Sequence, residues 1–201
     1  FTLKIEHPSN ASHRLPCLQF IMSIALAECI NRSTSLRPGL SARIKWPNDI
    51  YLSSASDGII GKIAGIIVNC SNSVERSVNH VLIGVGVNLF SDPNLPNITH
   101  LSDYLIDSSS IIKEDFLSEL VLRFRHLYSQ FLLTDQFPFT DYYALWLHSN
   151  QSIQIAENVR SSENVPVETC RIRGIDEFGY LVGVNEHGLK VKFEPDGNSF
   201  D

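Results

Sequence analysis

Apolar side chains recur at helical spacing in two long segments of this chain. In the first they lie three or four residues apart, which predicts an amphipathic helix over residues 14–31. Its apolar stripe consists of Leu15, Leu18, Met22, Ala25 and Cys29. A second stripe predicts a long helix that begins near residue 113 and contains Leu117, Leu120, Phe124, Leu127 and Phe131. Thr140 and Asp141 offer an N-cap to a last helix that runs through Leu147.

Between these helices the pattern changes to alternation, which is typical of strands. Residues 42–46 alternate between apolar and polar, a Pro-Asn-Asp turn follows, and residues 50–52 form a second short strand. Residues 62–70 and 81–89 are rich in β-branched side chains, and a polar connection of hairpin length separates them. We expect these two segments to lie side by side as antiparallel strands.

From about residue 152 onward, the chain contains only short strand patterns. They cover residues 153–156, 167–175, 180–184 and 190–193, and glycine-containing turns separate them. Strands of this length and spacing predict a small β-barrel. The whole pattern therefore predicts an α+β fold: a mixed or antiparallel sheet packed against helices over residues 1–150, and a small barrel over residues 151–201.

Composition excludes several classes of protein. The chain has 201 residues and a formal net charge of −6, and its Lys and Arg residues are dispersed, so no nucleic-acid partner is expected. No apolar run approaches the roughly 20 residues of a membrane span, so no membrane partner is expected either. The four cysteines include no C-x-x-C pair, which argues against a zinc site or a disulfide framework and fits a reducing compartment.

The strand over residues 81–89 has one face that calls for an explanation. With a period of two, its odd-numbered residues form an apolar face, while Leu82, Gly84, Gly86 and Asn88 form the other. Two glycines on one face either let a ligand approach the backbone or let a helix pack closely. In the first case Asn88 would supply a hydrogen-bond donor and an acceptor at the end of the trough.

Lys62 begins an otherwise apolar strand and also has two interpretations. It is either a solvated end group or a fixed cation that faces a carboxylate or a phosphate. The segment is not a P-loop, because Ser56 and Ile63 stand where that motif needs a glycine and a Ser or Thr.

The turn upstream of this strand combines several polar groups. Arg43 and Lys45 share one face of their strand, and the turn presents Asn48 and Asp49 together at the strand end. Trp46 is expected in the hydrophobic core rather than against a cofactor.

Three segments in this order resemble the biotin protein ligase family. They are K-W-P-N-D at residues 45–49, G-K-I-A-G-I at residues 61–66 and I-G-V-G-V-N at residues 83–88. The run P-D-G-N-S-F-D at residues 195–201 looks like the eukaryotic, holocarboxylase synthetase type of that family. The resemblance implies a class II synthetase-like biotin ligase core over residues 1–150 and an SH3-like β-barrel over residues 151–201.

The resemblance also implies an ATP-dependent reaction in two steps. Biotin and ATP give biotinyl-5′-AMP and pyrophosphate, and a lysine of an acceptor protein then takes the biotinyl group and releases AMP. The implied substrates are biotin and ATP with Mg²⁺, and the implied partners are biotin-dependent carboxylases with their biotin carboxyl carrier domains. The implied location is the cytoplasm, with the mitochondrion as a second compartment.

Residue roles follow from the same resemblance. Lys62 matches the catalytic cation, Lys45 is a second cation near the phosphate, and Asp49 is the group that orients or deprotonates the acceptor lysine. Lys45, Asn48 and Asn88 are the implied ATP-binding residues. The implied biotin-binding residues are Lys62, Gly65, Ile66, Gly84 and Gly86, and no residue is assigned to a metal.

One feature of that family is not found in this sequence. The family carries a Gly- and Arg-rich loop over bound biotin and adenylate, and no G-R-G-R run occurs among these 201 residues. The chain is therefore expected to be an N-terminally incomplete core that is weak or inactive by itself. Two alternatives stay open: a lipoate or octanoate transferase with the same core fold, and a non-catalytic fragment that binds carrier domains.

Overall fold

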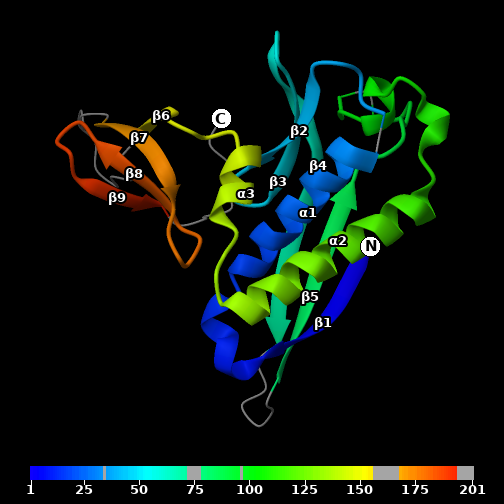
Figure 1. Ribbon diagram of the computed structural model, residues 1–201. Coiled ribbons are helices and arrows are strands. Elements are labelled where there is room, and N and C mark those ends of the chain that lie inside the picture. Colours follow the sequence, from blue (N-terminus) through cyan, green and yellow to red (C-terminus); the bar gives the residue numbers. More distant parts are fainter. Residues whose placement is uncertain (34, 72–77, 96, 156–167, 194–201) are drawn as a thin grey trace.

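The computed structural model describes residues 1–33, 35–71, 78–95, 97–155 and 168–193 (Figure 1). Its elements form a five-stranded sheet with helices on one face, followed by a four-stranded sheet. The P-D-G-N-S-F-D run at residues 195–201 lies outside the described residues.

The larger sheet is antiparallel throughout. Its strands are β1 (Thr2–Pro8), β2 (Leu40–Lys45), β3 (Asp49–Ser54), β4 (Gly58–Ser71) and β5 (Val78–Val87). They are arranged in the order β1-β5-β4-β3-β2, so each sheet neighbour runs in the opposite direction. The predicted antiparallel pair over residues 62–70 and 81–89 is confirmed as β4 and β5.

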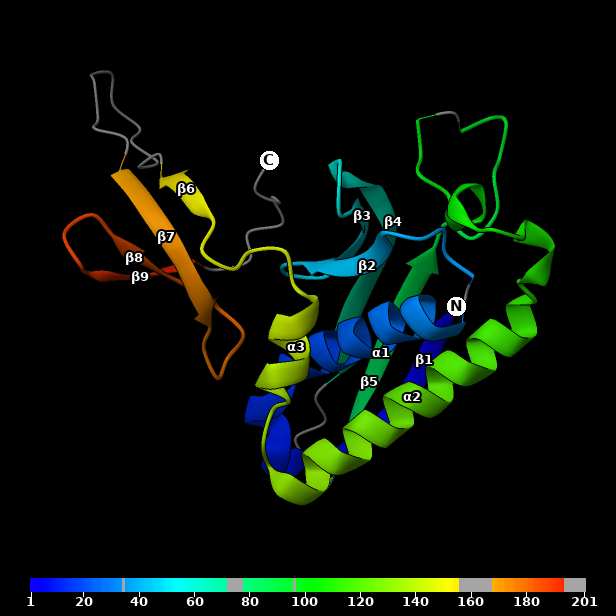
Figure 2. The same cartoon turned by 45° about the horizontal axis from the view of Figure 1, so that its top comes forward.

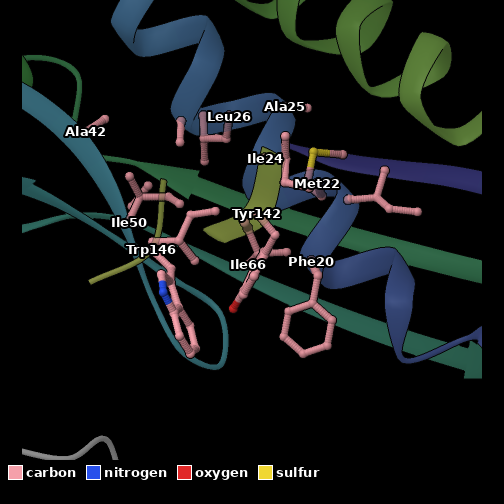
Figure 3. Close-up of a cluster of buried hydrophobic side chains, with 14 of the residues drawn as sticks. Phe20, Met22, Ile24, Ala25, Leu26, Ala42, Ile50, Ile66, Tyr142 and Trp146 are labelled. Carbon is pink, nitrogen blue, oxygen red and sulfur yellow. The ribbon is translucent and has the colours of Figure 1, made fainter. Parts of the chain in front are cut away.

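Helix α1 (Cys17–Ser33) crosses one face of this sheet, and α2 (Lys113–Thr134) runs beside it on the same side (Figure 2). The prediction of an amphipathic α1 is wrong, because residues from Leu18 to Ala27 are almost all 0–1% exposed, around the whole helix. The sheet covers one side of α1 and the other helices cover the rest, so the apolar cluster surrounds it (Figure 3). A helix that is apolar all round is a buried helix.

The two later helices agree with the sequence in position but differ in detail. In α2 the stripe packs as predicted, except that Leu117 is 37% exposed and Phe116 takes its place in the core. Helix α3 (Phe139–Leu145) begins one residue before Thr140, and Pro138 occupies its N-cap position without a side-chain bond. The prediction of a Thr140–Asp141 cap is therefore wrong. Short 3-10 helices span Ser9–Arg14, Leu101–Tyr104 and Ser108–Ser110.

The C-terminal region forms a second antiparallel sheet in the order β6-β7-β8-β9. Its strands are β6 (Ser152–Ile155), β7 (Glu168–Ile175), β8 (Leu181–Asn185) and β9 (Lys190–Phe193). The four predicted strands are therefore present. Among the described residues, β6 and β9 remain the two edges, so a small sheet is established and the SH3-like barrel is not. The boundary predicted at residue 150 falls between α3 and β6, and the division into two domains stays a prediction.

None of the described helices combines the length and the apolar character that crossing a membrane requires.

Candidate active site

A cavity of about 840 Å³ lies mainly over the face of the large sheet that points away from α1, and it extends to Gln19 near the start of that helix. The strand faces explain this position. Val81, Ile83 and Val85 of β5 point into the core, whereas Leu82, Gly84 and Gly86 point away from it. The cavity is lined by Phe1, Gln19, Pro47, Asn48, Asp49, Lys62, Ala64, Gly65, Ile66, Ile67, Gly84, Val85, Gly86 and Asn88.

The turn between β2 and β3 is fastened to β4 by Asn48. The Asn48 side-chain amide donates to the carbonyl of Ile66 at 2.8 Å, and the Ile66 N–H donates to the carbonyl of Asn48 at 2.9 Å. Because both the side chain and the backbone of Asn48 are held, the next residue, Asp49, is placed directly against β4.

Asp49 and Lys62 form an ion pair at one end of the cavity. Lys62 Nζ lies 2.7 Å from Asp49 Oδ1, and the two side chains are 49% and 13% exposed. Gly65 makes room for this pair, because a Cβ at residue 65 would lie 3.3 Å from Asp49 Oδ1 and 3.5 Å from Lys62 Nζ. Lys62 is thus a paired cation whose ammonium still reaches solvent, rather than a solvated strand end.

Glycines form a flat floor next to the ion pair. Gly65 of β4 is directly opposite Gly86 of β5, and Gly84 lies two residues away on the same face. A Cβ at Gly86 would meet nothing within 4 Å, and one at Gly84 would meet only the Ile67 carbonyl oxygen, at 3.7 Å. No helix packs on this floor in the described part of the chain, so close helix packing does not explain the two glycines of β5.

Asn88 closes the far end of β5. Its backbone N–H donates to the Ile63 carbonyl at 2.8 Å, and its side-chain amide donates to the Lys62 carbonyl at 3.4 Å. Asn88 therefore holds the backbone of Lys62 while it lines the cavity.

Two predicted site residues have a different placement. The Ile66 side chain is 0% exposed and belongs to the core cluster, so only its backbone is available to the cavity (Figure 3). Lys45 is not part of the lining: its Nζ lies 5.1 Å from the centre of the Tyr51 ring. It shares a sheet face with Asp49, because the two residues are opposite each other on β2 and β3.

Several lining residues were not predicted to belong to the site, above all Gln19. Gln19 is the first polar residue in an apolar helix, and this break in the apolar pattern could have indicated it. Phe1, Ala64 and Ile67 carried no such signal, because single apolar residues in strands are ordinary. Asp49 is the one carboxylate in the lining, and the described residues contain no group of three or more His, Cys, Asp or Glu side chains that suits a metal ion.

The Trp46 side chain, which precedes this turn, is held by the C-terminal half of the chain. It is 1% exposed, as the sequence predicts, and its indole N–H donates to the Gly179 carbonyl at 2.9 Å. Its backbone N–H donates to His148 Nε2 at 3.0 Å. The turn that carries Asn48 and Asp49 therefore rests on β4 on one side and on the C-terminal half on the other.

The arrangement suits a reaction between anions on a flat apolar surface. An ammonium group, a carboxylate and three side-chain amides line a cavity whose floor lacks side chains, so an extended ligand can lie against the backbone. The ion pair keeps both charged groups in fixed positions before any ligand arrives.

Comparisons with known proteins agree with this geometry. Residues 1–88 match the model of the "Biotin/lipoate A/B protein ligase family". The whole chain is 30% identical to "Biotin--protein ligase 2" of Arabidopsis thaliana and 32% identical to the human "Biotin--protein ligase". It covers 58% of the first and 27% of the second, so it spans little more than half of these relatives at most.

The fold is also similar to solved structures. The apo biotin protein ligase from Aquifex aeolicus superposes with a TM-score of 0.68 at 15% identity, over 96% of this chain and 78% of that one. The same enzyme in complex with biotin and ATP gives a TM-score of 0.66 at 16% identity, over 96% and 74% of the two chains.

Proposed function

We propose, from the premise that residues 1–88 form a domain of the biotin/lipoate A/B protein ligase family, that this chain is part of a biotin–protein ligase. The enzyme would activate biotin with ATP to biotinyl-5′-AMP and transfer the biotinyl group to a lysine of biotin-dependent carboxylases. The observation that carries the proposal is the Lys62–Asp49 pair beside the floor of Gly65, Gly84 and Gly86.

Lys62 serves the first step. A carboxylate oxygen of biotin forms a bond to the α-phosphorus of ATP, the bond from that phosphorus to the β-phosphate oxygen breaks, and pyrophosphate leaves. Two anions must meet, and an ammonium between them offsets their repulsion and stabilises the charge on the reacting phosphate. The Lys62 side chain is 49% exposed, so it can contact ligands while Asp49 holds it.

Asp49 serves the second step. The acceptor amine must lose a proton before it forms a bond to the biotinyl carbonyl carbon and displaces AMP. A carboxylate at hydrogen-bond distance orients the amine and accepts its proton. Asp49 is the one carboxylate of the cavity lining, and its pairing with Lys62 fixes its direction.

The remaining site residues would hold the two ligands. Biotin would lie along the glycine floor and the backbone of Ile66, and Asn48 and Asn88 would contact the adenylate. The side-chain amide N–H groups of both asparagines donate to β4 carbonyls, so their side-chain oxygens would be the atoms that accept hydrogen bonds from the adenylate. Lys45 would have to turn away from Tyr51 to reach a phosphate.

Mg²⁺ is proposed only as a companion of ATP. This ion usually takes one or two carboxylates together with substrate phosphates. The lining supplies one carboxylate, and Lys62 already pairs with it. The described residues therefore do not fit a protein-made magnesium site, and no step is assigned to the ion.

The holocarboxylase synthetase type, the carboxylase acceptors and the cytoplasmic location, with the mitochondrion as a second compartment, belong to the same proposal. The relatives from Arabidopsis thaliana and Homo sapiens support the eukaryotic type. The weak activity expected of these 201 residues by themselves also stays a prediction, so the experiments below use the complete gene product.

The test is the Lys62→Ala variant, compared with Lys4→Ala as a matched control. Lys4 is an exposed lysine of β1 on the same side of the sheet, but it does not line the cavity. We expect Lys62→Ala to abolish biotin-dependent release of pyrophosphate from ATP and Lys4→Ala to retain it. Equal activity of Lys62→Ala and the parent would contradict the proposed role.

Two other functions give different results in related measurements. A lipoate or octanoate transferase would bind lipoate more tightly than biotin in a calorimetric titration, although the K-W-P-N-D run favours biotin. A non-catalytic carrier-binding protein would keep its affinity for a carrier domain in the Lys62→Ala variant and would release no pyrophosphate in any variant.

A further inference from the structure

His148 lies at the junction between α3 and the C-terminal sheet, and it is 3% exposed. Its Nε2 accepts the backbone N–H of Trp46 at 3.0 Å, and its Nδ1 lies 2.7 Å from Gln151 Oε1. The neighbouring Leu147 N–H donates to the Ile44 carbonyl, so this segment follows the end of β2.

The hydrogen bonds leave one tautomer for this imidazole. A backbone N–H can only donate, so Nε2 must be unprotonated to accept from Trp46. Nδ1 then carries the proton and donates it to the Gln151 side-chain oxygen. Gln151 in turn accepts the Ile172 N–H of β7 through its own carbonyl at 2.8 Å. A continuous series of hydrogen bonds thus joins β7 to Trp46.

Trp46 receives a second bond from the same half of the chain. Its indole N–H donates to the carbonyl of Gly179, in the turn between β7 and β8. Gly179 has a φ of +85°, and a Cβ there would lie 2.2 Å from a Phe20 ring carbon, so this turn is seated directly on α1. Both the backbone and the side chain of Trp46 are fixed from the C-terminal half.

We infer that His148 is a positioning residue of the site: through Trp46 it holds the turn that places Asp49 against Lys62. Trp46 is three residues before Asp49, and Asn48 fixes only the β4 side of that turn. His148 is not part of the cavity lining, and it acts through the backbone of Trp46. This role rests on the proposed ligase function.

The test compares three variants of the complete gene product. His148→Leu removes the Nε2 acceptor from the Trp46 N–H, whereas His148→Gln keeps an oxygen that can accept the same N–H. Tyr143→Phe is the matched control. It removes two other hydrogen bonds between the two halves without touching Trp46: the Tyr143 hydroxyl accepts the Ile175 N–H at 3.0 Å and donates to the Ile175 carbonyl at 3.3 Å.

We expect His148→Leu to lower kcat for biotin transfer by about tenfold, because the Trp46 N–H loses its bond to His148 and Asp49 shifts. Its KM for biotin should change little, because the glycine floor does not contact His148. His148→Gln should restore most of kcat, and Tyr143→Phe should keep it. Unchanged kcat in His148→Leu, or an equal loss in Tyr143→Phe, would overturn the inference.

A second measurement separates this inference from the proposed function. In ¹⁵N-histidine NMR spectra, His148 should show an unprotonated Nε2 and a protonated Nδ1. A protein with this tautomer but without biotin-dependent activity would refute the ligase function and leave the anchoring of Trp46 in place. The opposite tautomer, or a doubly protonated ring at neutral pH, would refute the anchoring itself.

Discussion

Gly65 and Asp49 are opposite each other on β4 and β3, and a Cβ at residue 65 would lie only 3.3 Å from Asp49 Oδ1. The same Cβ would lie 3.5 Å from Lys62 Cε and Nζ. The absence of a side chain at Gly65 therefore leaves room for both members of the ion pair, and even a Cβ there would crowd the Asp49 carboxylate.

Replacement of Gly65 by alanine should separate these two charges. The Asp49 carboxylate must move by a few tenths of an ångström, whereas the Lys62 end atoms at 3.5 Å would be in ordinary contact. We expect biotin-dependent pyrophosphate release to fall about tenfold, because small misplacements of reacting groups are costly. The free energy of unfolding should change by less than about 1 kcal/mol, because the crowded atoms are the ends of side chains. Steady-state kinetics and urea denaturation measure the two effects. Full activity in Gly65→Ala would show that the ion pair does not need its present geometry.

Replacement of Gly86 by alanine should affect binding instead. Nothing lies within 4 Å of the added Cβ, so the protein accepts the methyl group without strain, but that group occupies the proposed biotin floor. We expect KM for biotin to rise about five- to tenfold with little change in kcat, which is the pattern of lost ground-state binding.

Leu82→Ala is the control for that variant. Leu82 lies on the same strand and the same face as Gly86 but outside the cavity lining. Its KM for biotin should equal that of the parent. An equal rise in KM for Gly86→Ala and Leu82→Ala would mean that any substitution on this face of β5 weakens biotin binding and that the glycine floor has no specific role.

Gly179→Ala should destabilise the protein by at least about 2 kcal/mol, because it combines a positive φ with a collision at Phe20. Gly188→Ala isolates the backbone component: Gly188 has a similar φ of +78°, and its added Cβ would meet nothing within 4 Å. Gly188→Ala should lower the free energy of unfolding by about 1 kcal/mol. Chemical denaturation of both variants gives the comparison, and equal losses would refute a tight contact between this turn and α1.

The stability of the protein should depend on pH through His148. Burial lowers the pKa of this imidazole below the ordinary value of 6.5, the charge of Lys45 acts in the same direction, and the hydrogen bond to Gln151 opposes the shift. Above about pH 6.5 the His148 imidazole is neutral in both the folded and the unfolded protein, so it does not make the free energy of unfolding depend on pH. Below it the unfolded chain takes up a proton that the folded protein does not, and the free energy of unfolding falls by up to about 1.4 kcal/mol per pH unit.

The measurement is urea denaturation of the parent and of His148→Gln between pH 5 and 8. The stability advantage of the parent should shrink as the pH falls below about 6.5, because the variant lacks the titrating ring. A constant difference in free energy of unfolding between the two proteins across this pH range would show that His148 has the same pKa in the folded and unfolded chains.

Sequence patterns anticipated what depends on local periodicity. The alternation along residues 81–89 separates Gly84 and Gly86 from the apolar face, and in the structure both glycines lie on the side of β5 that points away from the core. Trp46 is in the core as expected for a large ring at the end of a strand. Both conclusions follow from a period of two and from side-chain size, which the sequence states directly.

Features that depend on pairing between distant segments could not be read in this way. The contact of Lys62 with Asp49 requires the register of β3 on β4, which shifts between Ile50 and Tyr51. The placement of Lys45 over Tyr51 depends on the pairing of β2 with β3. The burial of α1 between Leu18 and Ala27 depends on α2 and the sheet covering it together, and a hydrophobic stripe on one helix does not indicate that.

The bond from the Trp46 indole to Gly179 joins residues 133 positions apart in the chain. Contacts of such long sequence separation form late, since the intervening chain must be ordered before they gain anything. During synthesis the ribosome must pass residue 179 before the K-W-P-N-D turn has both of its anchors. The site that begins near residue 45 therefore gains its second anchor only after residue 179 has been synthesised.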